Sequence, residues 1–216
     1  MLTLLPMTKS IGLFILFIFA LTFCYAQSFE GKITYKNSYK SKIPTFTDEQ
    51  LTAVMGSSQE FNMKGGNYQS TLNGTLVQWQ VYINKDNKIY SKFSNSPAVL
   101  WNDAAVNPDS VLSAKINKSV IDILGYKCDE LILTCRSGIQ KYYFNSKLKI
   151  DSKLFQNFKF QNWYEYVSRA NAIPLKMIVD NAQFSLESTA TEVLVQKIDD
   201  SLFVLPPNVT LEKNPY

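Results

Sequence analysis

Two cysteines, Cys128 and Cys135, are the side chains whose type and spacing most readily do chemistry, and both lie in YKCDELILTC. This stretch is typical of one strand, in which seven steps cover roughly 23 Å, whereas a disulfide needs Cα atoms about 4.4 to 6.8 Å apart. We therefore expect packed, unpaired thiols on opposite faces of the strand, because their separation is odd, unless a bulge resets the register. A disulfide through an unexpected turn and a reactive thiol stay open as alternatives, although Lys127 and Arg136 point away from the neighbouring sulfurs.

Histidine is absent from the chain, and this absence excludes Ser-His-Asp triads, Cys-His nucleophiles and imidazole metal sites. The closest carboxylate pair is Asp199 and Asp200, but adjacent strand residues point to opposite faces and do not converge on one substrate atom. We interpret one of the two as the cap of a short turn before Leu202 and Phe203. The sequence also has no Walker loop and no dinucleotide fingerprint, so we expect a protein that is not an enzyme and holds no catalytic residue, metal or cofactor.

Length and composition indicate one globular domain with a sizeable core. The chain has 216 residues, of which 46% are hydrophobic and 13% aromatic, and these values are ordinary for such a domain. Its 22 basic and 18 acidic residues leave a net charge of +4. The charges are scattered and form no Lys/Arg run of the kind that binds nucleic acid, so nucleic acid is not an expected partner.

The first 26 residues have the pattern of a cleavable secretory signal. Residues 11–23 form a 13-residue run without a charge, which is shorter than the roughly 20 residues that a helix needs to span a bilayer. We expect cleavage before Gln27 and a mature chain, 27–216, that is periplasmic or secreted and has no transmembrane helix. The alternative is a lipoprotein signal with Cys24 as the lipidated residue, but Phe23 occupies a position that normally holds a small residue.

The mature chain is predicted to fold as strands with little helix. Thr47 and Gln50 have the spacing of a capping box and predict a helix over about 48–55. Strand-like runs recur about every ten residues with connections too short for crossover helices, so we expect a curved antiparallel sheet. Residues 96–110 are expected to form a long loop, and residues 145–166 a loop or short helix. The strand-like runs cover residues 28–36, 58–64, 67–72, 76–84, 87–93, 126–135, 139–145, 173–180 and 184–198.

Four phrases, FEGKITYK, ILGYKCDELIL, IPLKM and IDDSLFVLPPNV, resemble the GLPGLI-like secreted proteins of Gram-negative bacteria. Beyond that group, the chain is similar to the LolA/LolB-like lipoprotein-carrier superfamily over nearly all of residues 27–216. The resemblance implies a strongly curved antiparallel sheet, an unclosed barrel, whose concave side is covered by one or a few short helices and can hold acyl chains. The GLPGLI motif itself is absent, since the chain has NAIPLKMIV where that motif would stand.

Aromatic side chains gather in residues 145–166 and allow two interpretations. Either they fill the core of the domain, or some of them line an apolar cleft that binds a ligand. We favour the second and expect non-catalytic binding of a lipid or other apolar envelope component in the concave face. The alternative is an interaction or assembly protein of the envelope, whose own side chains fill the concavity and whose partner is another envelope protein. The expected ligand-binding residues are Trp79, Trp101, Phe155, Phe158, Trp163 and Met177.

Overall fold

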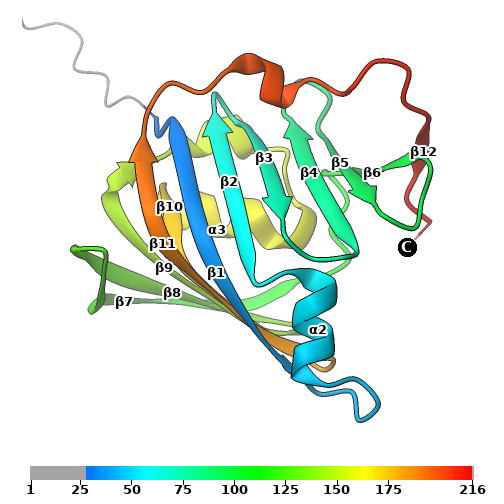
Figure 1. Ribbon diagram of the computed structural model, residues 1–216. Coiled ribbons are helices and arrows are strands. Elements are labelled where there is room, and N and C mark those ends of the chain that lie inside the picture. Colours follow the sequence, from blue (N-terminus) through cyan, green and yellow to red (C-terminus); the bar gives the residue numbers. More distant parts are fainter. Residues whose placement is uncertain (1–27, 216) are drawn as a thin grey trace, which may run out of the picture.

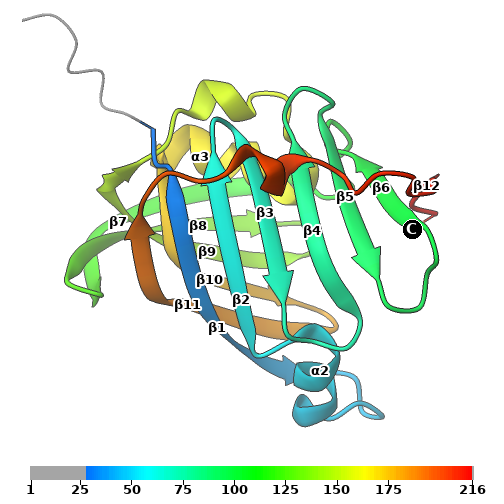
Figure 2. The ribbon, with the colours of Figure 1, turned by 45° about the horizontal axis from the view of Figure 1, so that its top comes forward.

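Twelve strands form one curved sheet in the computed structural model, which describes residues 28–215. The strand order is β12-β6-β5-β4-β3-β2-β1-β11-β10-β9-β8-β7, and neighbouring strands are antiparallel except for β12 and β6. Figures 1 and 2 show the sheet bent around helix α3, which lies on its concave side. The prediction of a mainly β protein, built as an unclosed antiparallel barrel with short helices, is therefore confirmed.

Short turns join most of the strands to the next, in the places where the sequence has Gly, Asn, Asp and Ser. The strands are β1 (Gly31–Ser41), β2 (Ser58–Lys64), β3 (Asn67–Leu72), β4 (Val77–Ile83), β5 (Lys88–Phe93), β6 (Val99–Asp103), β7 (Val111–Ile123), β8 (Tyr126–Cys135), β9 (Gly138–Lys149), β10 (Ala172–Asn181), β11 (Phe184–Val195) and β12 (Leu211–Lys213). The helical elements are α2 (Asp48–Met55), α3 (Trp163–Ala170) and the 3₁₀ turns η2 (Ser152–Phe155), η3 (Phe160–Asn162) and η4 (Asp200–Phe203).

The alternation predicted for the first strand defines the two faces of the sheet. Ile33 and Tyr35 are buried, whereas Lys32 and Thr34 beside them are only partly buried. Side chains of cross-strand partners stand on the same face, so the register carries this division to the neighbouring strands. The concave face, on which Ile33 and Tyr35 lie, therefore holds the apolar core, and the convex face carries Lys32 and Thr34.

Helix α2 begins and ends where the sequence predicts it. Both hydrogen bonds of the capping box are present, with the Gln50 amide donating to Thr47 Oγ1 at 3.2 Å and the Thr47 amide donating to Gln50 Oε1 at 2.9 Å. None of its residues is buried, and it contacts β1 at the lower end of the sheet in Figure 1. Helix α3 covers the concave face instead, with Tyr166, Val167 and Ala170 buried.

Three strands were not predicted, and each has a physical reason. The prediction of a loop over 96–110 is wrong for β6, which pairs with β5 despite the flanking prolines. Strand β12 has only three residues, too few for a recognisable pattern. Strand β7 is the outermost strand of the sheet and most of its side chains are exposed, so it lacks the alternation by which a half-covered strand is recognised.

Gly138 is the position where we expect a single methyl group to damage the sheet most. Its φ is +146°, and a Cβ there would lie 2.0 Å from the Asp180 carbonyl oxygen of β10. Gly125 is a matched control, since its φ is +79° but no atom lies within 4 Å of its Cβ position. By urea unfolding, Gly125→Ala should lower the free energy of unfolding by about 1 kcal/mol and Gly138→Ala by about 3 kcal/mol or more. Equal losses would contradict the close approach of β9 and β10.

Candidate functional site

Aromatic rings from two distant parts of the chain meet on the concave face. Phe158, in the segment between η2 and η3, stacks on Tyr82 of β4 with ring centroids 4.2 Å apart and an interplanar angle of 28°. It also lies over Tyr68 of β3 at 6.0 Å, and Phe155 stacks on Tyr82 at 6.4 Å. These contacts fix the segment before α3 against β3 and β4.

The rings of α3 extend the same cluster toward β9. Tyr166 stacks on Tyr142 of β9 at 4.2 Å, and Trp163 lies 5.5 Å from Tyr166. The Tyr166 hydroxyl donates to the Ala172 carbonyl at 2.7 Å. Burial raises the pKa of Tyr142 and of Tyr166 well above the ordinary value, so both phenols stay protonated at neutral pH. They pack and donate hydrogen bonds, and they do not act as acids or bases.

The structure brings four of the six predicted ligand-binding residues together. Phe155 and Phe158 are buried, Trp163 is partly buried within the same cluster, and Met177 of β10 packs against the core. All four are in contact with the protein's own side chains, so the centre of the concavity is filled.

Trp79 and Trp101 lie on the other face of the sheet. Tyr82 points into the concavity, so Trp79 and Val81 of the same strand point to the convex side. Trp101 lies opposite Tyr90, which lies opposite Val81, and these three side chains share the convex face. The two tryptophans are therefore separated from the aromatic cluster by the sheet itself.

A groove of about 410 Å³ opens between α3 and the start of β7. On the adjoining inner face, Ala114 and Ile116 of β7 lie opposite Leu133 and Leu131 of β8. Both leucines have 0% exposure, whereas Ile116 is 41% exposed. The apolar inner face is thus left uncovered at this end of the sheet. The groove is lined by Asn107, Asp109, Ser110, Val111, Leu112, Ser113, Ala114, Asn162, Glu165 and Arg169.

A buried polar network supports one wall of the groove. Asn162 is 1% exposed and has a left-handed φ of 62°; its Nδ2 donates to Asp109 Oδ2 at 3.1 Å, and its Oδ1 accepts from Asn107 Nδ2 at 2.7 Å. Desolvation raises the pKa of Asp109, but hydrogen bonds from Ser137, Ser110 and Asn162 outweigh it and lower the pKa overall. Asp109 is therefore ionised and holds the loop before β7 to α3.

Both cysteines are free, buried and part of the same core, so the prediction that they lie on opposite faces is wrong. Leu131, Leu133 and Cys135 follow the two-residue alternation of β8, and the alternation breaks between Leu131 and Cys128. There the pairing of β8 with β9 ends, at Asp129, and its register with β7 shifts. Burial, helped by Asp109, raises the pKa of Cys135 to about 11.

Residues 28–215 place no group of three or more Cys, Asp or Glu side chains where they could hold a metal ion. The same part of the chain contains no helix that is both long and apolar enough to cross a bilayer. The predicted signal, residues 1–26, and the alternative lipidation site Cys24 lie outside the described residues.

Comparison with known proteins shows likeness of fold at low sequence identity. No family model matches the chain, and no curated protein matches it. Among solved structures, one of PNGF-II aligns with 87% of this chain at 14% identity and a TM-score of 0.45, and this chain spans only 32% of its length. A LolA superfamily protein from Nitrosomonas europaea aligns with 82% of this chain and 91% of its own, at 8% identity and a TM-score of 0.38. We infer no function from likenesses this distant.

Thiol reactivity tests the placement of the two cysteines. With a pKa of about 11 for Cys135, only about 1% of this thiol is ionised at pH 9, compared with more than half of a thiol with the ordinary pKa of about 8.5. In the folded protein at pH 9 we expect negligible reaction with an aromatic disulfide reagent, and in denaturant without reductant two thiols per mature chain. Fast reaction of the folded protein would contradict the burial, and no thiols in denaturant would reveal a disulfide.

Proposed function

We propose that the protein is a non-catalytic binding protein of the bacterial cell envelope, exported by its N-terminal signal, that takes a lipid or another apolar ligand on the concave face. The observation that carries this proposal is the uncovered inner face of β7, where Ala114 and Ile116 are exposed beside the fully buried leucines of β8. Apolar surface of this kind on a soluble protein commonly marks a binding site. We also propose that the protein is related to the GLPGLI-like secreted proteins that its sequence resembles.

The ligand would lie at the end of the aromatic cluster and not within it. The centre of the concavity is occupied by Phe155, Phe158 and Tyr166, which have exposed fractions of 1%, 4% and 0%. An apolar chain placed along Ala114 and Ile116 would extend the buried surface of Leu131 and Leu133 without displacing a ring. The polar end of an amphipathic ligand would then lie near Asn107 and Arg169 at the mouth of the groove.

A second candidate function is favoured by the filled cluster itself. A concavity packed with the protein's own rings needs no ligand for its stability, so the protein could serve as an interaction or assembly component of the envelope. In that case the inner face of β7 would be covered by another envelope protein. The two candidates differ in what binds at Ile116, which is a lipid in the first and another protein in the second. One pair of variants tests whether anything binds there.

Ile116→Asp and Ile139→Asp form a matched pair for testing the binding site. The two isoleucines are 41% and 39% exposed; Ile116 lies on the concave face, and Ile139 lies on the convex face, since it alternates with the concave Tyr142. In a titration with a dansylated long-chain fatty acid, we expect saturable binding by the parent protein, at least a tenfold weaker affinity for Ile116→Asp and an unchanged affinity for Ile139→Asp.

The same titration contains the outcomes that decide between the candidates. Equal loss in both variants would show that the probe adheres to apolar surface in general, and no saturable binding by the parent protein would overturn the apolar-ligand proposal. Circular dichroism of each variant checks that the sheet is intact, because both aspartates would sit at exposed positions. The assembly role would be supported if the parent protein bound no fatty acid but co-purified with one envelope protein, and if Ile116→Asp abolished that co-purification.

A further inference from the structure

The convex face of the sheet carries a continuous surface of polar and aromatic side chains that the proposed function does not use. The register between neighbouring strands lines up two rows that run across β1 to β6. Because cross-strand partners share a face, each row is a set of neighbouring side chains. One row contains Lys32, Asn62, Gln69, Val81, Tyr90 and Trp101, and the other contains Thr34, Glu60, Thr71, Trp79, Lys92 and Val99.

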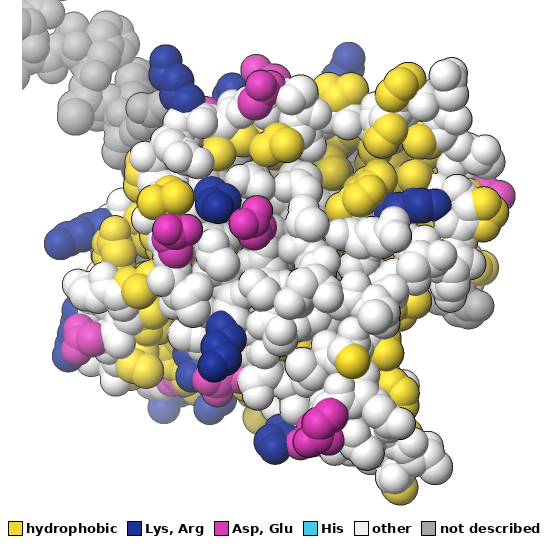
Figure 3. All heavy atoms as spheres, viewed as in Figure 1, with side chains coloured by type: hydrophobic (Ala, Val, Ile, Leu, Met, Phe, Trp, Pro, Cys, Tyr) yellow, Lys and Arg dark blue, Asp and Glu magenta, His cyan; other side chains and the backbone are white. Residues whose placement is uncertain are grey.

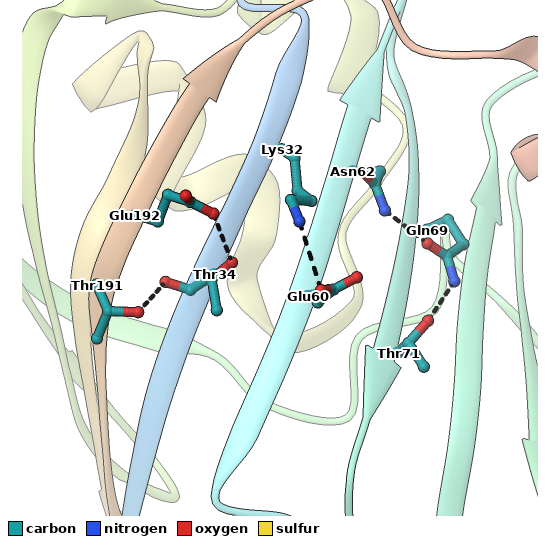
Figure 4. A network of polar contacts seen from close by, with 8 residues as sticks. All are labelled: Lys32, Thr34, Glu60, Asn62, Gln69, Thr71, Thr191 and Glu192. Carbon is teal, nitrogen blue, oxygen red and sulfur yellow. Dashed lines mark hydrogen bonds and ion pairs between the residues drawn. The ribbon is translucent and has the colours of Figure 1, made fainter.

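The half of this surface over β11, β1, β2 and β3 is a ladder of hydrogen-bonding groups (Figure 4). Asn62 Nδ2 donates to Gln69 Oε1 at 2.9 Å, and Gln69 Nε2 donates to Thr71 Oγ1 at 2.6 Å. Lys32 Nζ lies 3.4 Å from Glu60 Oε1, so that lysine is paired. Amide, hydroxyl and carboxylate groups therefore alternate over a broad area, offering both donors and acceptors with little net charge.

The half over β4, β5 and β6 is aromatic and positively charged. Figure 3 shows hydrophobic side chains gathered over these strands, around a hollow in the surface. Trp79 and Trp101 are partly exposed and flank the buried Val81 and Tyr90. They stand two strands apart and one row apart, or about 12 Å by ordinary strand spacing, a span that a short oligosaccharide can bridge.

Two lysines beside Trp101 carry positive charge, and the nearest carboxylate in the register is that of Asp103, directly opposite Lys88. Lys88 Nζ lies 4.0 Å from the Trp101 ring centroid and Lys213 Nζ lies 5.9 Å from it. Neither lysine forms an ion pair within residues 28–215. The cation–π contact holds the Lys88 ammonium over the indole, while its flexible four-carbon stem allows it to move aside and remain close to an acid bound there.

We propose that this convex surface binds a glycan chain in which acidic sugars are separated by neutral ones. The apolar faces of pyranose rings would stack on Trp79 and Trp101, and an acidic group would lie between Lys88 and Lys213. Neutral sugar hydroxyls would continue along the ladder, donating to Glu60 and accepting from the amide of Gln69.

Charge density distinguishes a glycan from single-stranded nucleic acid as the ligand of this surface. Single-stranded nucleic acid also combines base stacking with cationic contacts, but it carries one phosphate per nucleotide. Continuing over β2, β1 and β11, that backbone would meet the carboxylates of Glu60 and Glu192. Sugar hydroxyls donate hydrogen bonds to such carboxylates, so the polar half of the surface favours a sparsely charged glycan.

Binding to three soluble probes tests this proposal. The probes are hyaluronan hexasaccharide, in which uronates alternate with neutral sugars, a neutral dextran oligosaccharide, and oligothymidylate. With the mature protein, calorimetry and intrinsic tryptophan fluorescence should show binding of hyaluronan, binding of dextran at least fivefold weaker, and none of oligothymidylate. Tighter binding of oligothymidylate than of either glycan, or no binding of any glycan, would overturn the proposal.

Several variants then locate the site, so that the conclusion does not depend on the stability of any one of them. Trp101→Ala should weaken hyaluronan binding at least tenfold, and the double change Lys88→Gln with Lys213→Gln should weaken it while leaving dextran binding unchanged. Gln69→Ala should weaken both glycans. Ile116→Asp, on the concave face, should leave glycan binding unchanged even where it abolishes fatty-acid binding, so the failure of one proposal is distinguishable from the failure of the other. Loss of all glycan binding in Ile116→Asp would contradict a convex site.

Discussion

The stack of Phe158 on Tyr82 is the contact on which the rest of the architecture depends. An open, strongly curved sheet has an apolar inner wall that must be covered, and in this chain the cover is supplied by residues 151–170. Phe158 and Phe155 attach that segment to β3 and β4, and Tyr166 attaches it to β9. Because one short segment contacts both halves of the sheet, it fixes their curvature as well as covering the core.

The length of that cover determines where the inner wall stays open. Helix α3 ends at Ala170, and the chain then returns to the sheet as β10. The polar network around Asn162 holds the loop before β7 to the helix, but nothing in residues 28–215 extends over Ile116. An uncovered end is thus a consequence of one helix of eight residues covering a sheet of twelve strands.

The sequence predicts the elements more reliably than the faces on which their side chains stand. A capping box and strict alternation are local signals, so α2 and most of the strands could be recognised from them. The faces of Trp79 and Trp101 depend on the register with distant strands, and the face of Cys128 on a break in alternation at Asp129. The uncovered inner face of β7 was missed with the strand itself, because its apolar residues, at 111, 114, 116 and 121, are irregularly spaced across two register shifts.

The two faces of the sheet suit ligands that differ in chemistry, and the sheet separates them. On the concave side Ala114 and Ile116 continue a dry core beyond the polar groove, which favours an apolar chain. On the convex side the aromatic rings lie among amides, hydroxyls and two lysine ammonium groups, and an apolar chain there would bury polar groups without partners. A hydroxyl-rich ligand satisfies those groups and still covers the indoles. One sheet can therefore present a lipid site on the concave face of β7 and β8 and a glycan site on the convex face of β1 to β6, so that neither ligand competes with the other.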